Sequence, residues 1–384
     1  MRARTGLNHR SVEKLIVLAA LACLALAAVG AAAAAAVPPS LKAGTKTVSG
    51  GYAFSVAIKG DGSLWTWGAN TSGQLGRTGI GSVPGRVGSA KTWALVAAGF
   101  DHTLALRADG GLWSWGSKAD GRLGRTGKNR VPGRVGDAKD WMVVAAGRAH
   151  SLALKRNGTL WSWGGNDQGQ LGRSGDSAVP KQVGTAKTWV AIGCGWDSSY
   201  AIRSDGTLWS WGANDSGQLG RTGAKGKPAK VAGAGWAAVS GGRWHALAVR
   251  RNGTLWSWGA NADGQLGRVG AGTTPGQVGP GADWKAASSG ALFSLALKQD
   301  GSVWSWGSNA AGQLGRSGVG MLPGRVGGVT TWAGLSSGSA HCLAFQSDDS
   351  LWAWGWNLGG QLGDGSTASS ALPLPVGSLA AATL

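Results

Sequence analysis

Short runs in which apolar and polar residues alternate recur along most of this chain. In residues 159–164, Thr-Leu-Trp-Ser-Trp-Gly, the alternation places both tryptophans on one side of a β-strand and the serine on the other. The apolar residues 152–154 come before this segment, and Asn157-Gly158 separates the two. This dipeptide is favoured in two-residue type I′ turns, because both turn residues then need positive φ. The pattern predicts a β-hairpin.

The hairpin pattern returns at a fixed period. Successive tryptophan pairs are 48, 48, 48, 47, 48 and 48 residues apart, and a period in this range is typical of a chain built from structural repeats. The seven pairs are Trp65/Trp67, Trp113/Trp115, Trp161/Trp163, Trp209/Trp211, Trp256/Trp258, Trp304/Trp306 and Trp352/Trp354. Each unit also has an apolar segment upstream, such as residues 141–147, and a Pro-Gly-Arg-Val type segment, such as residues 132–135. About four short strands in each unit are the content of one propeller blade.

The sequence therefore predicts an all-β fold, a seven-bladed β-propeller. A two-stranded hairpin is marginal alone, so we expect each unit to bury its tryptophans against its neighbours. Six more tryptophans recur at one equivalent position, where large aromatic residues fill the interfaces between blades. The last unit lacks the strand that should follow it, whereas residues 47–58 supply a spare copy. We expect pairing of the N- and C-terminal strands to close the ring without an open sheet edge.

A longer consensus joins these segments. It reads Gly-x-x-His-Ser-Leu-Ala-Leu, then Asp/Asn-Gly-Thr-Leu-Trp-Ser-Trp-Gly-x-Asn-x-x-Gly-Gln-Leu-Gly-Arg, and it is matched seven times across about residues 45–384. This pattern resembles the repeat of the regulator of chromosome condensation family. The resemblance implies a seven-bladed β-propeller, in agreement with the count of repeats. It says less about function, because one fold serves many functions.

Residues 1–36 are of a different kind. Basic residues precede the apolar run 15–29, and the alanines that follow offer small-residue cleavage sites, which is the composition of a secretory signal peptide. The alternative is an uncleaved membrane anchor, since residues 15–36 are long enough to span a bilayer. We expect residues 37–44 to be a linker and residues 45–384 to be the propeller. Either kind of leader would place the domain outside the cytoplasm, as a secreted, periplasmic or cell-surface protein.

Residues that could carry catalysis or bind metal are sparse. Outside the leader the chain has Cys194 and Cys342, at different positions of the repeat, so we expect buried thiols and no disulfide. Four histidines share one repeat position, which Phe54, Ser198 and Phe293 fill in the other units; they are His102, His150, His245 and His341. No carboxylate or thiolate recurs beside them, so we expect hydrogen-bonding histidines and no metal site. No catalytic residue, enzymatic activity or cofactor is predicted, because no carboxylate pair recurs and no serine lies in a nucleophile elbow.

The positive charge is large and partly periodic. The chain has 37 basic and 18 acidic residues, a net charge of +19, and +16 remains without residues 1–36. One arginine set follows the Gln-Leu-Gly segment: Arg77, Arg125, Arg173, Arg221, Arg268 and Arg316. A second basic set precedes the hairpin turn: Lys59, Arg107, Lys155, Arg203, Arg250 and Lys298. Because the hairpin strands are antiparallel, the two sets should lie at opposite ends of each blade, as two basic rings. These rings are either a solvated surface or the source of an electrostatic field that attracts polyanions.

Two loops vary while the rest of the repeat stays nearly constant. One lies before the histidine position and the other follows Trp-Gly, and both should lie at the blade end that carries the first arginine ring. The candidate binding residues in these loops are Tyr52, Phe100, Arg148, Trp196, Arg243, Trp244 and Trp356. We expect them to form a binding face together with that arginine ring, because loops on rigid scaffolds carry function and binding hot spots favour aromatic residues and arginine. The alternative is that the aromatic residues only cover the core at the mouth of the ring.

These observations favour a monomeric, non-enzymatic propeller that docks a protein partner through one loop face. A second hypothesis is salt-sensitive recognition of an anionic cell-surface polymer or glycan, with sugars stacked on Trp196, Trp244 and Trp356. The third is guanine-nucleotide exchange on a small GTPase, as in the founding member of the family that the repeat resembles. The leader argues against it, and so does a spacing that leaves no room for the inserted wedge of that exchange factor. Nucleic acid is not an expected partner outside the cytoplasm, and we expect membrane contact only through an uncleaved leader.

Overall fold

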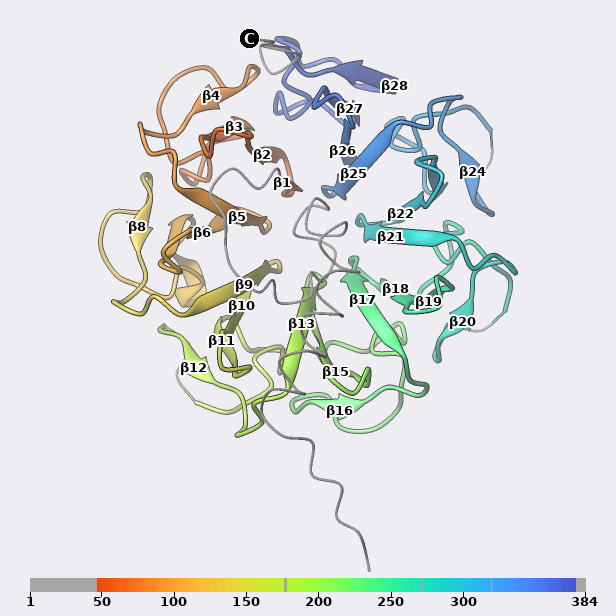
Figure 1. Ribbon diagram of the computed structural model, residues 1–384, viewed down its shortest axis with the longest axis horizontal. Coiled ribbons are helices and arrows are strands. Elements are labelled where there is room, and N and C mark those ends of the chain that lie inside the picture. Colours follow the sequence, from red (N-terminus) through yellow and green to blue (C-terminus); the bar gives the residue numbers. More distant parts are fainter. Residues whose placement is uncertain (1–46, 176–177, 271, 319, 378–384) are drawn as a thin grey trace, which may run out of the picture.

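Seven four-stranded antiparallel sheets are arranged as blades around a central axis (Figure 1). The computed structural model describes residues 47–175, 178–270, 272–318 and 320–377, so the predicted leader and linker lie outside the described residues. In every blade the first strand lies nearest the axis and the fourth lies at the rim (Figure 1). The prediction of an all-β, seven-bladed propeller is confirmed.

Each blade takes its strands from one continuous stretch of the chain. Blade 1 has β1 (Thr47–Gly50), β2 (Phe54–Ile58), β3 (Leu64–Gly68) and β4 (Gly85–Arg86); blade 2 has β5 (Trp93–Ala98), β6 (His102–Arg107), β7 (Leu112–Gly116) and β8 (Gly133–Arg134). Blade 3 has β9 (Trp141–Ala146), β10 (His150–Lys155), β11 (Leu160–Gly164) and β12 (Lys181–Gln182); blade 4 has β13 (Trp189–Cys194), β14 (Ser198–Arg203), β15 (Leu208–Gly212) and β16 (Ala229–Lys230). Blade 5 has β17 (Trp236–Gly241), β18 (His245–Arg250), β19 (Leu255–Gly259) and β20 (Gly276–Gln277); blade 6 has β21 (Trp284–Ser289), β22 (Phe293–Lys298), β23 (Val303–Gly307) and β24 (Gly324–Arg325). Blade 7 has β25 (Trp332–Ser337), β26 (His341–Gln346), β27 (Leu351–Gly355) and β28 (Ser370–Pro375).

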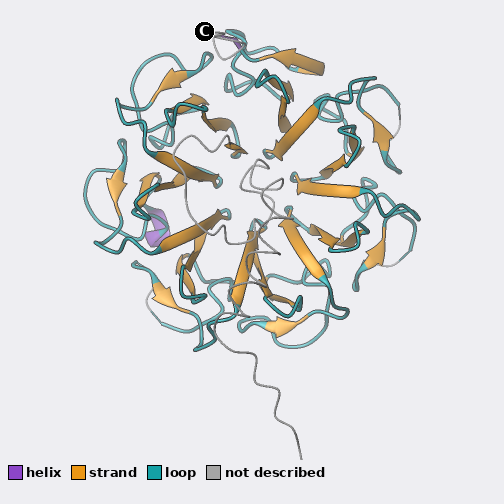
Figure 2. Ribbon diagram, viewed as in Figure 1, coloured by secondary structure: helices purple, strands orange, loops and turns teal. Residues whose placement is uncertain are grey.

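Helix is almost absent from the described residues. They contain one short 3₁₀ helix, η1 (Ala119–Gly121), in blade 2, which is the purple turn in Figure 2. None of the helices among the described residues has the length and apolarity needed to cross a membrane.

The hairpin turn differs from the predicted one. Of Asn157 and Gly158 only the glycine has a positive φ, 76°, and its N–H donates to the Lys155 carbonyl over 2.9 Å. The turn is therefore a three-residue loop, a type I turn followed by a left-handed glycine, and not a type I′ turn. The Asn157 side chain accepts hydrogen bonds from the backbone N–H and the hydroxyl of Thr159, which stabilises the turn. The predicted hairpin is confirmed, and the predicted turn type is wrong.

A repeated hydrogen-bond network joins each blade to the next. The second tryptophan of every pair is fully buried, and its indole N–H donates to a backbone carbonyl of the Gln-Leu-Gly segment, or its Arg-Leu-Gly equivalent, in the preceding blade. Between blades 3 and 4, Trp211 donates to the Gln170 carbonyl over 2.9 Å and Ser199 donates to the same carbonyl over 2.8 Å. The Nε2 atom of His150 lies 2.9 Å from the Ser199 hydroxyl. One carbonyl thus holds two side chains of the neighbouring blade, which explains why these residue types repeat.

The apolar core lies between blades. One cluster joins Leu152 and Leu160 of blade 3 to Trp189, Ile192 and Trp211 of blade 4. The tryptophans that begin the first strands of blades 2 to 7 are at most 5% exposed, and the second tryptophans of the pairs are not exposed at all. The prediction that the periodic tryptophans pack at interfaces is confirmed for these two sets, while the first tryptophan of each pair is half-buried.

The ring closes by packing between the first and last blades, which we call the junction. Among the described strands, no sheet combines strands from the two ends of the chain. The predicted pairing of N- and C-terminal strands is therefore wrong, because each blade begins with its inner strand and β1 completes blade 1. The repeated network crosses the junction instead: His341 Nε2 lies 3.0 Å from the Ser55 hydroxyl, and Trp67 donates to the Gln361 carbonyl over 2.8 Å. Figure 1 shows the two end blades side by side.

Candidate functional site

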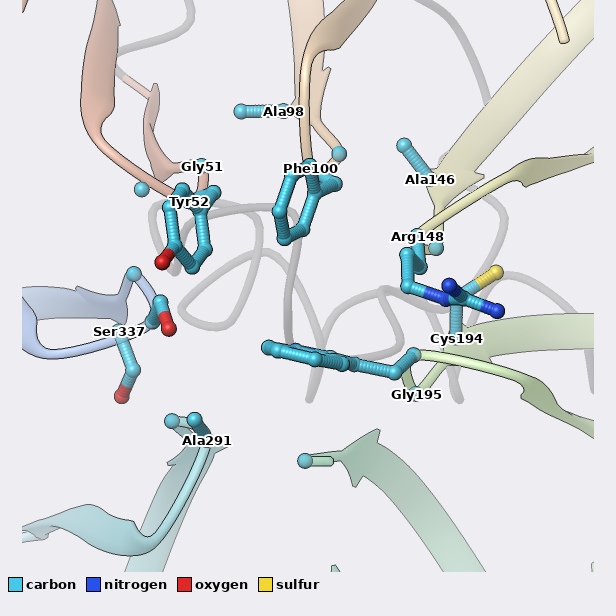
Figure 3. Close-up of a pocket in the computed structure, with 18 of the residues that line it drawn as sticks. Gly51, Tyr52, Ala98, Phe100, Ala146, Arg148, Cys194, Gly195, Ala291 and Ser337 are labelled. Atoms are coloured by element: carbon cyan, nitrogen blue, oxygen red, sulfur yellow. The ribbon is translucent and has the colours of Figure 1, made fainter. Parts of the chain in front are cut away.

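The variable loops meet at one mouth of the ring. Tyr52, Phe100, Trp196 and Trp356 come from blades 1, 2, 4 and 7, yet their rings contact one another, and we call them the mouth cluster. Tyr52 stacks on Phe100 with ring centroids 4.1 Å apart (Figure 3). The Tyr52 centroid lies 6.4 Å from that of Trp196 and 5.7 Å from that of Trp356. Because blades 1 and 4 stand on opposite sides of the ring, the cluster bridges the mouth.

A series of six backbone hydrogen bonds, running from blade 2 round the ring to blade 1, holds these loops. Each bond runs from a loop N–H to a carbonyl in the corresponding loop of the next blade. The donors and acceptors are Phe100 to Gly147, Arg148 to Trp196, Trp196 to Gly242, Arg243 to Ala291, Ala291 to Ser339 and Ser339 to Gly51. Glycine precedes the loops because the strands approach closely: a Cβ on Gly147 would lie 2.7 Å from the Gly195 carbonyl oxygen and 2.3 Å from the His150 ring. The binding residues therefore stand on a fixed frame.

A small cavity opens beside the mouth cluster. Its volume is about 70 Å³, room for only a few water molecules. Tyr52 and Phe100 form part of an aromatic wall, and Ala291 lies across the cavity from them (Figure 3). Trp196 of blade 4 adds to the wall, whereas blades 5 to 7 contribute small residues such as Ser339. The mouth is therefore asymmetric, with bulky rings on one side and space on the other.

Trp244 belongs to a second group, built around Arg243. The Arg243 guanidinium carbon lies 4.4 Å from the ring centroid of Trp196 and 3.9 Å from that of Trp244. Both contacts are within the range of cation–π attraction. Trp244 is 38% exposed, so this group of one guanidinium and two indoles, which we call the Arg243 sandwich, is open to solvent at Trp244. Trp196 connects the sandwich to the mouth cluster.

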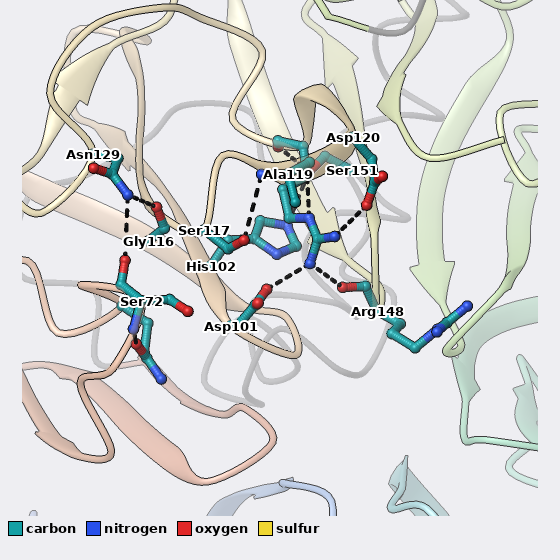
Figure 4. A network of polar contacts seen from close by, with 12 residues as sticks. Ser72, Asp101, His102, Gly116, Ser117, Ala119, Asp120, Asn129, Arg148 and Ser151 are labelled. Carbon is teal, nitrogen blue, oxygen red and sulfur yellow. Dashed lines mark hydrogen bonds and ion pairs between the residues drawn. The ribbon is translucent and has the colours of Figure 1, made fainter.

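Arg148 is positioned by an ion-pair network that the sequence analysis did not predict. The Nε of Arg148 donates to both carboxylate oxygens of Asp197 over 3.1 Å, and the Arg148 carbonyl accepts from Arg122 over 3.2 Å. Arg122 is nearly buried and pairs with Asp101 at 2.6 Å and with Asp120 (Figure 4). Arg122 replaces the glutamine of Gln-Leu-Gly in blade 2, and that departure from the repeat was the signal available in the sequence.

The first arginine ring does not join the mouth cluster. Arg77 folds over β4 at the rim, where it donates from Nη2 to the Thr66 carbonyl over 2.7 Å and from Nη1 to the Thr78 carbonyl over 3.0 Å. The equivalent side chains make the same kinds of bond within their own blades: Arg125, Arg173, Arg221, Arg268 and Arg316. Partial burial lowers the pKa of Arg77. These six predicted binding residues therefore lie apart from the seven in the variable loops, and their hydrogen bonds stabilise the loops at the rim.

The second basic ring also serves the fold. The Arg107 guanidinium carbon lies 4.7 Å from the ring centroid of Trp93 and 4.1 Å from that of Trp113. Equivalent stacking on one or two indoles is made by Lys59, Lys155, Arg203, Arg250 and Lys298. Periodic charge in this chain is thus largely committed to contacts inside the blades.

The histidines and cysteines are buried in the interfaces. Burial lowers the pKa of His150, His245 and His341 to about 3, because the charged imidazolium would lose its hydration. Among the described residues, no group of three or more histidine, cysteine or acidic side chains could hold a metal ion. Cys194 and Cys342 are free and buried, and burial raises the pKa of both thiols. None of these residues lies in a site that resembles a catalytic centre.

Seven sheets that repeat one interblade network, with an aromatic and arginine-bearing mouth, define a β-propeller built from copies of one sequence motif. The chain belongs to the RCC1-like domain family, which matches residues 24–318 and, in a second overlapping match, residues 96–383. No curated protein matches the chain.

Solved structures share the architecture. Human WBSCR16 is 26% identical, with a TM-score of 0.74 over 82% of this chain and 93% of that one. Prp20p from Saccharomyces cerevisiae is 23% identical, with a TM-score of 0.73 over 81% of this chain and 85% of that one. The ectodomain of the Arabidopsis thaliana receptor kinase ACR4 is 16% identical, with a TM-score of 0.53 over 87% of this chain and 99% of that one. The likeness to the last two concerns the fold alone.

Proposed function

We propose that this chain is a non-enzymatic binding propeller that docks a protein partner through its mouth. The observation that carries the proposal is the mouth cluster, in which aromatic rings from four blades contact one another at the end of the ring where a series of backbone hydrogen bonds joins the loops. Aromatic rings and arginines that are already held in place lose little conformational entropy on binding, and such residues dominate binding energy at interfaces. Prp20p, a protein of the same fold, has binding properties to Gsp1p and histones and has been crystallised with Kap60.

The location that we propose is outside the cytoplasm. It rests on residues 1–36, whose basic start, apolar run and alanine-rich end have the composition of a signal peptide. N-terminal sequencing of the protein recovered from the growth medium or the cell envelope tests it. A start between residues 31 and 45 supports cleavage and export, an intact leader in the membrane fraction supports an anchor, and an intact chain in the cytosol contradicts the proposal.

Capture by the exported protein tests the docking function. The tagged full chain would be expressed in its own host, cross-linked, purified and compared with a Trp196→Ala/Trp244→Ala/Trp356→Ala variant. We expect one predominant protein to be lost from the variant at constant melting temperature. The matched control is Val269→Ser, which changes an 88% exposed side chain outside the mouth and should leave capture unchanged. Equal capture by the triple variant would refute the proposal.

The material captured in this experiment also distinguishes between the other two hypotheses. Recovery of an acidic glycan, with binding that falls steeply as salt rises, would favour the anionic-polymer hypothesis, which the net charge of +19 supports. The intramolecular bonds of both basic rings weigh against it. Recovery of a small GTPase whose nucleotide exchange the protein accelerates would favour the exchange-factor hypothesis instead.

A further inference from the structure

We infer that the mouth binds a carboxylate-bearing segment of a protein, with a small apolar side chain placed beside the carboxylate. The inference rests on the proposed docking function and names the chemistry of its partner. Its elements are the Arg243 guanidinium with its two indoles, the outer nitrogens of Arg148 and the cavity beside Trp196. Arg243 and the cavity adjoin Trp196, and Nε of Arg148 is bonded to the neighbouring Asp197.

Arg243 lies against two indole rings, and its side-chain donors are available. The ring centroids of Trp196 and Trp244 lie 4.4 and 3.9 Å from the guanidinium carbon, while the side-chain N–H groups donate to no acceptor within the part of the chain that the structure describes. A guanidinium presents its donors in one plane, which matches a planar carboxylate in a two-bond contact. Stacking also removes the rotational freedom that an exposed arginine would lose on binding. The sandwich is therefore a preorganised anion-binding group.

Arg148 adds a second guanidinium near Trp196, beside the same cavity. Its Nε is occupied by Asp197, its backbone N–H donates to Trp196, and its carbonyl is held by the nearly buried Arg122. The side chain remains 47% exposed. Its terminal nitrogens, Nη1 and Nη2, have no acceptor among the described residues. Asp197 thus fixes the direction of Arg148 without using its outer donors.

The surroundings of the two arginines favour a polypeptide over a polyanion. Asp101, Asp120 and Asp197 lie in the same network as Arg148, so closely spaced phosphates or sulfates would meet like charges at the mouth. Arg243 itself has no ion pair with any of these acids, so it can bind a single carboxylate. The adjacent cavity, lined by Tyr52, Phe100 and Trp196, has a volume of about 70 Å³. It has room for one small side chain packed against aromatic rings and is too small for a sugar-phosphate backbone.

Fluorescence anisotropy of labelled peptides with the full chain tests the inference. The probes are acetyl-Gly-Glu-Leu-Asp-Gly-amide, its Gln/Asn analogue without charge, and its analogue with glycine in place of leucine. We expect the first peptide to bind about tenfold or more tightly than either analogue, because each lacks one of the two contacts. An excess of oligothymidylate or heparin should displace it poorly.

Variants connect the preference to the arginines. Arg243→Gln should weaken binding of the acidic peptide about tenfold to a hundredfold. Arg243→Lys should weaken binding less, because the charge remains while the planar donors are lost. Arg148→Gln should weaken binding as well. The matched control is Arg325→Gln, which removes the same charge from an exposed rim strand and should not change binding. Melting temperatures of all variants should stay within a few degrees of the parent.

The outcomes that overturn the inference are distinct from those that overturn docking. Equal binding of the acidic and neutral peptides, with loss in Trp356→Ala, would refute the acid preference and retain the mouth as a docking surface. Equal binding in Arg243→Gln and the parent would refute the role of the sandwich. Failure of the acidic peptide to bind at millimolar concentration would also refute the inference. In that case, loss of the captured protein partner in the Trp196→Ala/Trp244→Ala/Trp356→Ala variant would still support docking through the mouth. Displacement of the labelled acidic peptide by oligothymidylate or heparin, at the same concentration of negative charge, would favour the anionic-polymer hypothesis.

Discussion

The junction between blades 1 and 7 offers a sharp test of how this ring is held together. Trp67 of β3 is fully buried and packs with Val48 of its own blade and with Leu343 and Leu362 of blade 7. Its indole N–H donates to the Gln361 carbonyl over 2.8 Å. We predict that Trp67→Ala destabilises the protein strongly and loosens the junction in particular. The neighbouring Trp65→Ala is the matched control within the same strand.

The expected magnitude follows from burial. Removing a fully buried tryptophan costs about 3–5 kcal/mol of unfolding free energy, because apolar contacts are lost and a cavity remains. The Gln361 carbonyl keeps its hydrogen bond from the Ser55 hydroxyl at 2.7 Å, so no unsatisfied acceptor adds to this cost. For a domain of this size each kcal/mol lowers the melting temperature by about 2 °C, which gives a fall of about 6–10 °C. Trp65 is half-buried and donates only to Ser63 in its own hairpin, so its removal should cost less.

Thermal melts and hydrogen exchange together measure the two effects. Trp163→Ala removes the equivalent indole between blades 2 and 3, where a short loop tethers the blades. At the junction the blades are tethered only through the rest of the ring, so local opening should be easier there. We expect faster exchange in β1 and β26 of Trp67→Ala than in β6 and β9 of Trp163→Ala. Equal exchange in the two variants, or equal melting temperatures for Trp65→Ala and Trp67→Ala, would refute the reasoning.

Three further predictions concern the repeat. The pKa of His150, His245 and His341 falls from 6.5 to about 3 on folding. Because the folded state disfavours protonation, the free energy of unfolding should decline as pH drops from about 6.5 towards 3. Changing all three histidines to phenylalanine should make the melting temperature less dependent on pH, and an unchanged dependence would contradict this. Asp349→Gly should raise the unfolding free energy by about 1 kcal/mol, because Asp349 has a φ of 73° where the other six hairpins have glycine. A lower melting temperature of the variant would contradict this prediction. Arg125→Gln should lower the unfolding free energy by about 1–2 kcal/mol through its lost bonds to the Ser114 carbonyl, whereas the exposed Arg134→Gln should change it little; equal losses in urea titrations would count against a structural role.

The blade could be predicted from residues that are close in the chain. Alternation in Leu160 to Trp163, a glycine after Asn157 and the period of the tryptophan pairs depend on local backbone geometry and on the need to bury indoles. The same reasoning failed at the ends of the blades. It took residues 47–58 for a spare copy of a strand, because a periodic pattern does not reveal at which strand each blade begins.

The candidate site could be predicted only in part. The variation of the loop residues singled out Tyr52, Phe100 and Trp196, and the structure places their rings together. Arg77 and its equivalents were chosen for their regular charge, and the structure shows that they are half-buried donors to carbonyls of their own blades. A repeated charge is as consistent with a repeated internal bond as with a repeated surface group.

The sequence by itself determined the hairpin, the number of blades and the residues that fill each interface, because these follow from turn chemistry, side-chain alternation and the burial of large apolar surfaces. Only the tertiary structure decided which loop residues meet. Tyr52 and Trp196 are far apart in the chain and stand on blades on opposite sides of the ring, yet their rings lie 6.4 Å apart. That distance is set by the rotation accumulated over the intervening blades and by closure of the ring at the junction, and no local pattern in the sequence encodes it.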